Sequence, residues 1–288
     1  MNERMRGGAG RIVASPVLLV LIAIASVQVG SSLAKDLYSS AGPLSVAWVR
    51  LVAAALILAA ITRPKLRGRA LSDWGWVLAY GLCLVGMNVT FYLAIERIGI
   101  GLAVTLEFLG PLAVSVAHSR RARDLLWVGL AAIGVVVLGF GPSSHDIVGV
   151  VWALAAASLW AGYILLAGPT GRRWSGVTGL TVGLWIGAAL FTPVVIALGE
   201  LPPLDARVLG IGVAIGFASS VVPYGLEMVA LRRIQPRVFG ILMSLEPAAA
   251  ALFAFLLLGE TLGVAEIIAM ACVVAASVGV VRTEEPVK

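Results

Sequence analysis

Three glutamates lie inside apolar segments that are long enough to cross a lipid bilayer. Glu107 is in the segment Val-Thr-Leu-Glu-Phe-Leu-Gly-Pro, Glu227 is in Pro-Tyr-Gly-Leu-Glu-Met, and Glu246 is in Met-Ser-Leu-Glu-Pro-Ala. An acid near the middle of a membrane costs roughly 2.5–3.5 kcal/mol on insertion scales, so it usually marks a path for a substrate, an ion or a proton. The alternative is a structural hydrogen bond buried between helices. Three such acids in one chain favour the transport interpretation.

Two prolines repeat one local pattern in the two halves of the chain. Pro111 and Pro247 each lack the amide that would bond to the carbonyl four residues earlier. The released carbonyls belong to Glu107 and Met243, and Glu246 lies inside the second weakened turn. Freed backbone groups at membrane depth are tolerated where they face protein or a wet cavity. We interpret both prolines as hinges, against the alternative of helix kinks that only serve packing.

Polar and aromatic side chains recur at helical spacing within the apolar segments. Those interpreted as facing a substrate are Gln28, Asn88, Tyr92, Trp160, Tyr163 and Tyr224. Amides and hydroxyls bond polar groups, and the faces of aromatic rings can hold an ammonium. The set therefore suits a zwitterionic organic solute. The alternative for each aromatic residue is core packing or a place in the belt at the membrane interface.

Arg50 is a cation inside an expected helix, roughly 10 Å from its outer end at 1.5 Å per residue. Glu107 and Asn88 are expected at a similar depth from the same side. Arg50 could therefore hold the carboxylate of a solute. It could instead form a purely structural ion pair with Glu107, and the sequence leaves this alternative open.

The composition is that of an integral membrane protein. The chain is 60% hydrophobic and 12% charged, with a mean hydropathy of +1.02, whereas a soluble globular chain carries roughly 25% charged residues. Apolar windows of about 20 residues, the length that spans a bilayer core, predict ten transmembrane helices. They fall at 15–34, 43–62, 74–95, 101–118, 125–141, 147–168, 177–199, 207–230, 238–258 and 263–281.

The basic residues fall on one side of this ten-helix arrangement. Of the 21 Lys and Arg residues, 17 lie in the N-terminal segment, the alternate loops and the tail, and only Lys35, Arg97 and Arg207 lie on the other side. The positive-inside rule then places both termini in the cytoplasm. The net charge of +6 reflects this topology, so we expect no nucleic-acid partner.

The two halves of the chain resemble each other. The segment that begins at Phe91 aligns with the one that begins at Glu227, and the same offset aligns Pro111 with Pro247. We therefore predict an all-α membrane protein of ten transmembrane helices, built as two inverted-topology five-helix repeats. In secondary transporters such repeats place the site at their interface near the midplane. The predicted parts are a cytoplasmic segment 1–14, repeats 15–141 and 147–281, and a cytoplasmic tail 282–288.

Enzyme and cofactor signatures are lacking in the sequence. It contains no His-Glu-x-x-His, Gly-x-Ser-x-Gly or phosphate-binding Gly-x-x-x-x-Gly-Lys motif. Cys83 and Cys272 are too few for a thiolate metal site. We expect no enzyme activity, no cofactor and no bound metal. A membrane receptor or scaffold is a further alternative, but ten spans leave almost no chain for loops.

The sequence resembles the threonine/homoserine exporters among the EamA-type members of the drug/metabolite transporter superfamily. The resemblance covers about residues 15–281 and is carried by Gln28 with 32–35, and by 86–93, 106–114, 119–121, 223–228, 239–247 and 259–262. It implies two five-helix inverted repeats and efflux of small amino acids from the cytoplasm, driven by the proton gradient.

From these observations we expect a bacterial inner-membrane exporter of small neutral amino acids that works by alternating access. Glu107, Glu227 or Glu246 would hold the substrate ammonium or carry the proton as coupling ion. Arg50 or freed backbone groups would hold the carboxylate. The alternative within transport is an EamA-type exporter of another small metabolite or a drug.

The predicted topology can be tested by labelling single cysteines with a membrane-impermeant reagent in intact cells. Cysteines at Asp146 and Glu200 are expected to react from outside, and those at Arg67, Arg121 and Arg172 only after the membrane is opened, because of the basic asymmetry. Labelling of position 121 from outside would contradict the ten-helix arrangement.

Overall fold

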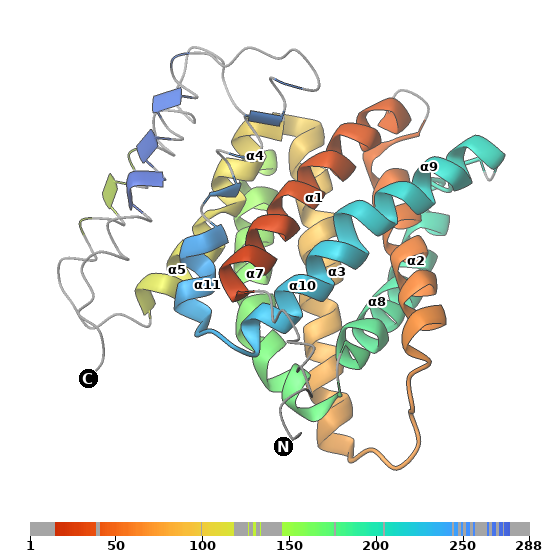
Figure 1. Ribbon diagram of the computed structural model, residues 1–288. Coiled ribbons are helices and arrows are strands. Elements are labelled where there is room, and N and C mark those ends of the chain that lie inside the picture. Colours follow the sequence, from red (N-terminus) through yellow and green to blue (C-terminus); the bar gives the residue numbers. More distant parts are fainter. Residues whose placement is uncertain are drawn as a thin grey trace, which may run out of the picture.

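Long apolar runs form the helices of this protein. The structure is a computed structural model that describes residues 15–38, 41–98, 100–117, 146–175, 177–203 and 205–243, with scattered positions at 126–133 and 245–276. Every element within these residues is helical (Figure 1). The elements are α1 (Pro16–Tyr38), α2 (Pro43–Thr62), α3 (Leu71–Ile98), α4 (Ile100–Glu107), α5 (Leu109–Ala117), α7 (Ile147–Arg173), α8 (Thr178–Ala197), α9 (Ala206–Gly216), the π-helical turn η1 (Phe217–Val221), α10 (Val222–Leu231) and α11 (Pro236–Met243).

Five described helices are long and apolar enough to cross a membrane. They are α2, α3, α7, α8 and the continuous run Ala206–Leu231 of α9, η1 and α10. The predicted window 43–62 coincides with α2, and the window 207–230 differs from the last run by one residue at each end. Most of the windows 125–141 and 263–281 and part of the window 238–258 lie outside the described residues, so the count of ten spans stays a prediction.

Several helix boundaries follow from local side-chain chemistry. The carboxylate of Asp146 accepts a hydrogen bond from the backbone N–H of Val148 at 2.8 Å and begins α7. Asp205 caps α9 in the same way through Val208, also at 2.8 Å. These acids satisfy amides that have no partner within the helix. After α8, Gly199 has a φ of 70°, a conformation that glycine adopts without strain and that ends helices.

The window predicted as one helix at 101–118 is divided into two short helices. α4 ends at Glu107, Phe108 lies in a turn, and α5 begins at Leu109. The amide of Leu112 bonds to the carbonyl of Phe108 at 3.4 Å, but Pro111 has no amide to offer Glu107. The Phe108 ring meets the Trp160 ring edge to face, with centroids 5.6 Å apart. The proline and this ring contact account for the interruption.

A second interruption lies in the run from α9 to α10. In η1 the amide of Val222 bonds to the carbonyl of Phe217, five residues earlier. Pro223 cannot bond to the carbonyl of Ser219, and a π-helical turn is a common way to accommodate such a gap. Ser219 and Ser220 are buried within this turn. The turn sets the direction of the helix that carries Tyr224 and Glu227.

Helices from the two halves of the chain pack against each other. From the first half, α3 contacts α7 and α8 of the second half. From the second half, the run of α9 and α10 contacts α1 of the first half, and α9 also contacts α2. α2 additionally contacts α8, and α11 contacts α5. Figure 1 shows α1 beside α9 and α10 along one side of the bundle. The buried core consequently lies between the halves.

Polar contacts join both ends of α3 to residues of the second half. At the C-terminal end, Arg97 donates to Asp146 at 2.6 Å, and this hydrogen bond holds the pKa of the Asp146 carboxyl below its ordinary value. At the N-terminal end, the indole N–H of the buried Trp174 donates to the carbonyl of Asp73 at 3.2 Å. These contacts hold α3 and α7 in register.

Gly81 permits the close approach of α3 and α8. A Cβ at this position would lie 2.5 Å from the carbonyl oxygen of Gly183 and 2.9 Å from its Cα. Gly81→Ala is therefore expected to lower the melting temperature and folded yield in detergent, because overpacking costs about 1–3 kcal/mol. Gly75→Ala is the matched control, since Gly75 lies on the same helix with open space around it. Equal melting temperatures of the two variants would contradict this packing argument.

Candidate functional site

A buried hydrogen-bond network joins helices of the two halves around Tyr224. The side-chain amide of Asn88 on α3 donates to the hydroxyl of Tyr224 on α10 at 2.9 Å, and to the carbonyl of Leu84 at 2.7 Å. The guanidinium of Arg50 on α2 donates to the same hydroxyl at 3.5 Å. All three side chains are buried. The network therefore fixes an amide, a phenol and a cation at one place in the bundle.

The Arg50 guanidinium also lies over an aromatic ring. Its central carbon is 5.4 Å from the ring centroid of Tyr92, within the range of a cation–π interaction. Tyr92 is buried on α3, four residues after Asn88. The charge of Arg50 is thus held by tyrosines from two helices while its side chain stays 9% exposed.

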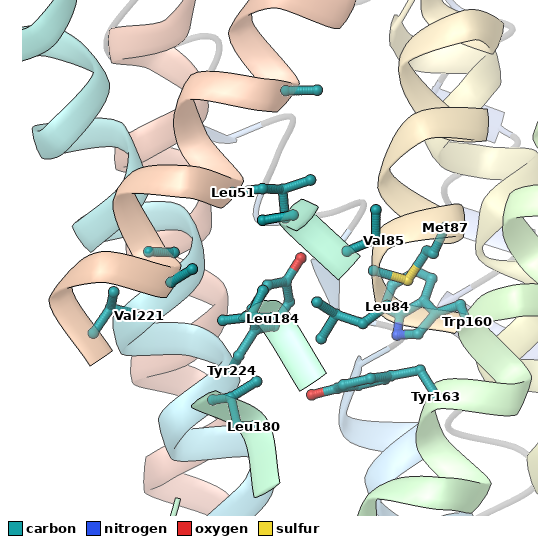
Figure 2. Close-up of a cluster of buried hydrophobic side chains, with 14 of the residues drawn as sticks. Leu51, Leu84, Val85, Met87, Trp160, Tyr163, Leu180, Leu184, Val221 and Tyr224 are labelled. Atoms are coloured by element: carbon teal, nitrogen blue, oxygen red, sulfur yellow. The ribbon is translucent and has the colours of Figure 1, made fainter. Parts of the chain in front are cut away.

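Glu227 is bound by a phenol. The hydroxyl of Tyr163 on α7 donates to Oε2 of Glu227 at 2.7 Å. The Tyr163 ring lies 5.3 Å from the Tyr80 ring and 6.0 Å from the Tyr224 ring, measured between centroids. Figure 2 shows Tyr163 and Tyr224 among Leu84, Leu180 and Leu184. The carboxylate is therefore enclosed by aromatic and aliphatic groups.

Glu246 lies within electrostatic reach of both other intramembrane glutamates. Glu246 interacts with Glu227 and with Glu107, and Glu107 also interacts with Arg50. The Oε2 atom of Glu246 is buried and has no hydrogen-bond partner among the described residues. Glu107, at the end of α4, is 9% exposed and Glu227 is 3% exposed. Acids that are far apart in the sequence are thus brought together with Arg50.

The remaining predicted site residues have different positions. Gln28 is buried on α1, which packs against α10. Trp160 contacts Phe108 beside Glu107, and Pro111 is buried in α5 close to the helix interruption. Pro247 lies outside the described residues. The hinge roles of both prolines stay predictions.

Sequence reasoning missed Tyr80, whose ring stacks on Tyr163. Tyr80 is fully buried on α3. A signal was present, since Tyr80, Leu84, Asn88 and Tyr92 follow one another at steps of four residues, which places neighbours on one helix face. Among the described residues no cluster of three histidine, cysteine or acidic groups has the arrangement of a metal site.

Comparison with known proteins identifies the family. Residues 147–282, which begin at α7, match the EamA-like transporter family. The chain is 41% identical over 283 residues to a Salmonella typhimurium (strain LT2) protein named threonine/homoserine exporter RhtA, covering 95% of this chain and 94% of that one. The Escherichia coli K12 protein of the same name is 40% identical with the same coverage. The chain belongs to the EamA-like transporter family.

Within the drug/metabolite transporter superfamily this chain groups with the threonine/homoserine exporters, as its sequence suggested. A Bacillus subtilis protein named uncharacterized transporter YwfM is 27% identical over 238 residues, with 77% of this chain and 79% of that one covered. One crystal structure of a protein has a TM-score of 0.68 at 19% identity and covers 91% of this chain and 96% of that one, which shows a shared fold. EamA-like proteins are membrane transporters, so the expectation that this chain is no enzyme is confirmed.

The roles of Arg50 and Glu107 can be separated by removing both charges. Arg50→Leu and Glu107→Leu are each expected to lower folded yield, because an unpaired buried charge costs about 3–5 kcal/mol. The double variant is expected to fold again but to remain inactive, since Arg50 also contacts Tyr224 and Tyr92. The measurement is efflux normalised to folded protein. Wild-type efflux per folded molecule from the double variant would show that the pair is only structural.

Proposed function

We propose that this EamA-like transporter exports small neutral amino acids of the threonine and homoserine type from the cytoplasm across the bacterial inner membrane. Identity of 40–41% over 95% of the chain to proteins named threonine/homoserine exporters carries this proposal. The buried cluster agrees with it chemically. A zwitterion needs a cation for its carboxylate and an anion for its ammonium, and Arg50 and the three glutamates supply both signs.

The polar groups around Arg50 suit the carboxylate end of such a substrate. A guanidinium presents five N–H donors in a planar fork that matches a carboxylate. The Tyr224 hydroxyl is hydrogen-bonded both to the Asn88 amide and to the Arg50 guanidinium, so these polar groups lie together. Gln28 and Trp160, from α1 and α7, complete the proposed lining. The acids at Glu107, Glu227 and Glu246 serve the ammonium and a coupled proton.

Alternating access between two inverted five-helix repeats would move this substrate, with both termini in the cytoplasm. The packing of the helices supports such a relation. In this relation α1 is equivalent to α7, α2 to α8, and α3 to the run of α9 and α10. The contact of α3 with α7 then corresponds to that of α10 with α1, and the contact of α3 with α8 corresponds to that of α9 with α2. An offset of 136 residues relates α4 to α11, and also Asn88 to Tyr224. Equivalent residues that bond each other belong near the axis of a twofold relation.

Proton coupling is proposed from the acids in the bundle. Carboxylates in apolar surroundings bind and release protons in response to neighbouring charge. Here Glu246 is within reach of both Glu107 and Glu227. An inward proton gradient could then drive the outward movement of the amino acid, while Pro111 and Pro247 permit the connecting helices to bend.

Counterflow into proteoliposomes tests the function directly. Vesicles loaded with unlabelled homoserine are expected to accumulate labelled threonine through the purified protein, and a pH gradient is expected to change the rate. Vesicles without protein are the control. Accumulation of other metabolites or drugs in place of neutral amino acids would contradict the proposed substrate class and leave the transporter family unaffected.

The acids can be tested by neutral substitutions that keep shape. Glu227→Gln and Glu246→Gln are expected to reach normal membrane abundance, while export is largely lost in at least one of them, because the amide retains most hydrogen bonds but no charge. Glu96→Gln is the matched control, since Glu96 is exposed near the end of α3. Full export by both site variants would contradict a role for charge.

A further inference from the structure

We propose that two of the acids have different tasks: Glu246 holds the substrate ammonium, and Glu227 carries the proton that is exchanged for the substrate. The assignment rests on the proposed amino acid export and deepens it. It comes from the different surroundings of the two carboxylates. One is enclosed and already bonded, and the other has an oxygen atom with no hydrogen-bond partner.

We infer that the surroundings of Glu227 suit a proton better than an ammonium group. Its side chain is 3% exposed, and the fully buried Tyr163 donates to Oε2 at 2.7 Å. The Tyr80 and Tyr224 rings both contact the Tyr163 ring. A substrate ammonium at Oε2 would have to displace the phenol of Tyr163. A proton needs no more than one lone pair, and binding it removes the charge from an apolar site.

Glu246 has the surroundings of an ammonium ligand. It is more exposed than Glu107 or Glu227, and its buried Oε2 atom has no hydrogen-bond partner among the described residues. An unsatisfied buried acceptor is unfavourable, and an ammonium carries three donors and the opposite charge. Arg50, which interacts with Glu107, supplies the cation for the other end of the zwitterion.

The two sites are linked because Glu227 and Glu246 repel each other when both are ionised. A proton on Glu227 relieves this repulsion, and an ammonium at Glu246 relieves the same repulsion. Whichever binds second therefore gains less than it would alone, so proton and substrate oppose each other's binding. By reciprocity, substrate binding expels the proton and acid weakens substrate binding. This antagonism is what an exchanger requires.

Among the described residues, four titratable groups interact with Glu227. They are Tyr163 on α7, Tyr80 on α3, Tyr224 one turn earlier on α10, and Glu246 beyond the end of α11. The described side chains of α1, α8 and η1 contain no titratable group. The pH response of substrate binding should therefore include a contribution from Glu227 and the phenol that bonds to it, beside that of Glu246 and the neighbouring Glu107.

The experiment measures homoserine binding to the purified full-length protein in detergent by calorimetry, in two buffers that differ in ionisation enthalpy. The wild type is expected to release protons on binding, with an apparent Kd that rises by up to about tenfold per unit of falling pH. Glu227→Gln should bind homoserine with clearly less proton release than the wild type and with a flattened pH dependence. Glu246→Gln should lose at least about tenfold in affinity, as expected for one charged contact. Glu96→Gln should match the wild type.

The opposite pattern would overturn the assignment. Loss of binding in Glu227→Gln with binding retained in Glu246→Gln would exchange the two roles. Unchanged proton release in Glu227→Gln would exclude that residue as the proton carrier. If Glu227→Gln fails to fold, Tyr163→Phe replaces it: retained binding with a displaced pH midpoint supports the proposal, and an unmoved midpoint contradicts it. A wild-type protein that binds no neutral amino acid would instead overturn the proposed function itself.

Discussion

The position of one guanidinium constrains much of this bundle. Arg50 lies within an apolar helix, and a charge in such surroundings is tolerated only with partners from the protein. These come from other helices: Tyr224 from α10 and Tyr92 from α3, with Asn88 fixing the orientation of Tyr224. The charge on α2 consequently requires that α3 and α10 approach it at this depth. That requirement joins the two halves of the chain through polar contacts within the apolar core.

Irregular backbone lies beside these polar groups. The interruption at Phe108 directly follows Glu107, and the π-helical turn directly precedes the helix that carries Tyr224 and Glu227. In each case a nearby proline leaves a carbonyl without its usual donor. Such backbone is stable at membrane depth only where protein or water can satisfy it. Regular helices such as α2 and α8 surround this region, and the interrupted helices carry Glu107 and Glu227.

The sequence predicted helices better than it predicted their interruptions. Apolar length alone located α2, because the twenty predominantly apolar residues Pro43–Thr62 have one low-energy arrangement in a membrane. Pro111 indicated a weakened turn near Glu107, but the ring contact of Phe108 with Trp160 from another helix, which accompanies the break there, could not be predicted. Sequence reasoning also missed the π-helical turn, since Pro223 could equally have produced a simple kink.

A similar limit applied to the site. Intramembrane acids are unusual enough to be recognised individually, and the structure brings Glu246 within electrostatic reach of Glu107 and Glu227. The partners of these acids were harder to predict. A tyrosine such as Tyr80 is an ordinary residue on a buried helix face. The contact of its ring with the Tyr163 ring connects it with Glu227. Contacts between helices that are distant in sequence leave little trace in a single sequence.

The proposed twofold scaffold has chemically unequal halves, as the proposed zwitterionic substrate would require. The offset of 136 residues pairs Asn88 with Tyr224 and Phe91 with Glu227, and the offset of 135 that relates α2 to α8 pairs Arg50 with the half-exposed Trp185. Equivalent positions thus share a backbone role but not a charge. A strictly symmetric site would present the same group twice, whereas an amino acid needs a cation at one end and an anion at the other. In the proposed mechanism, the repeated helices form the scaffold that rocks. The different side chains at equivalent positions give the site a positive end and a negative end.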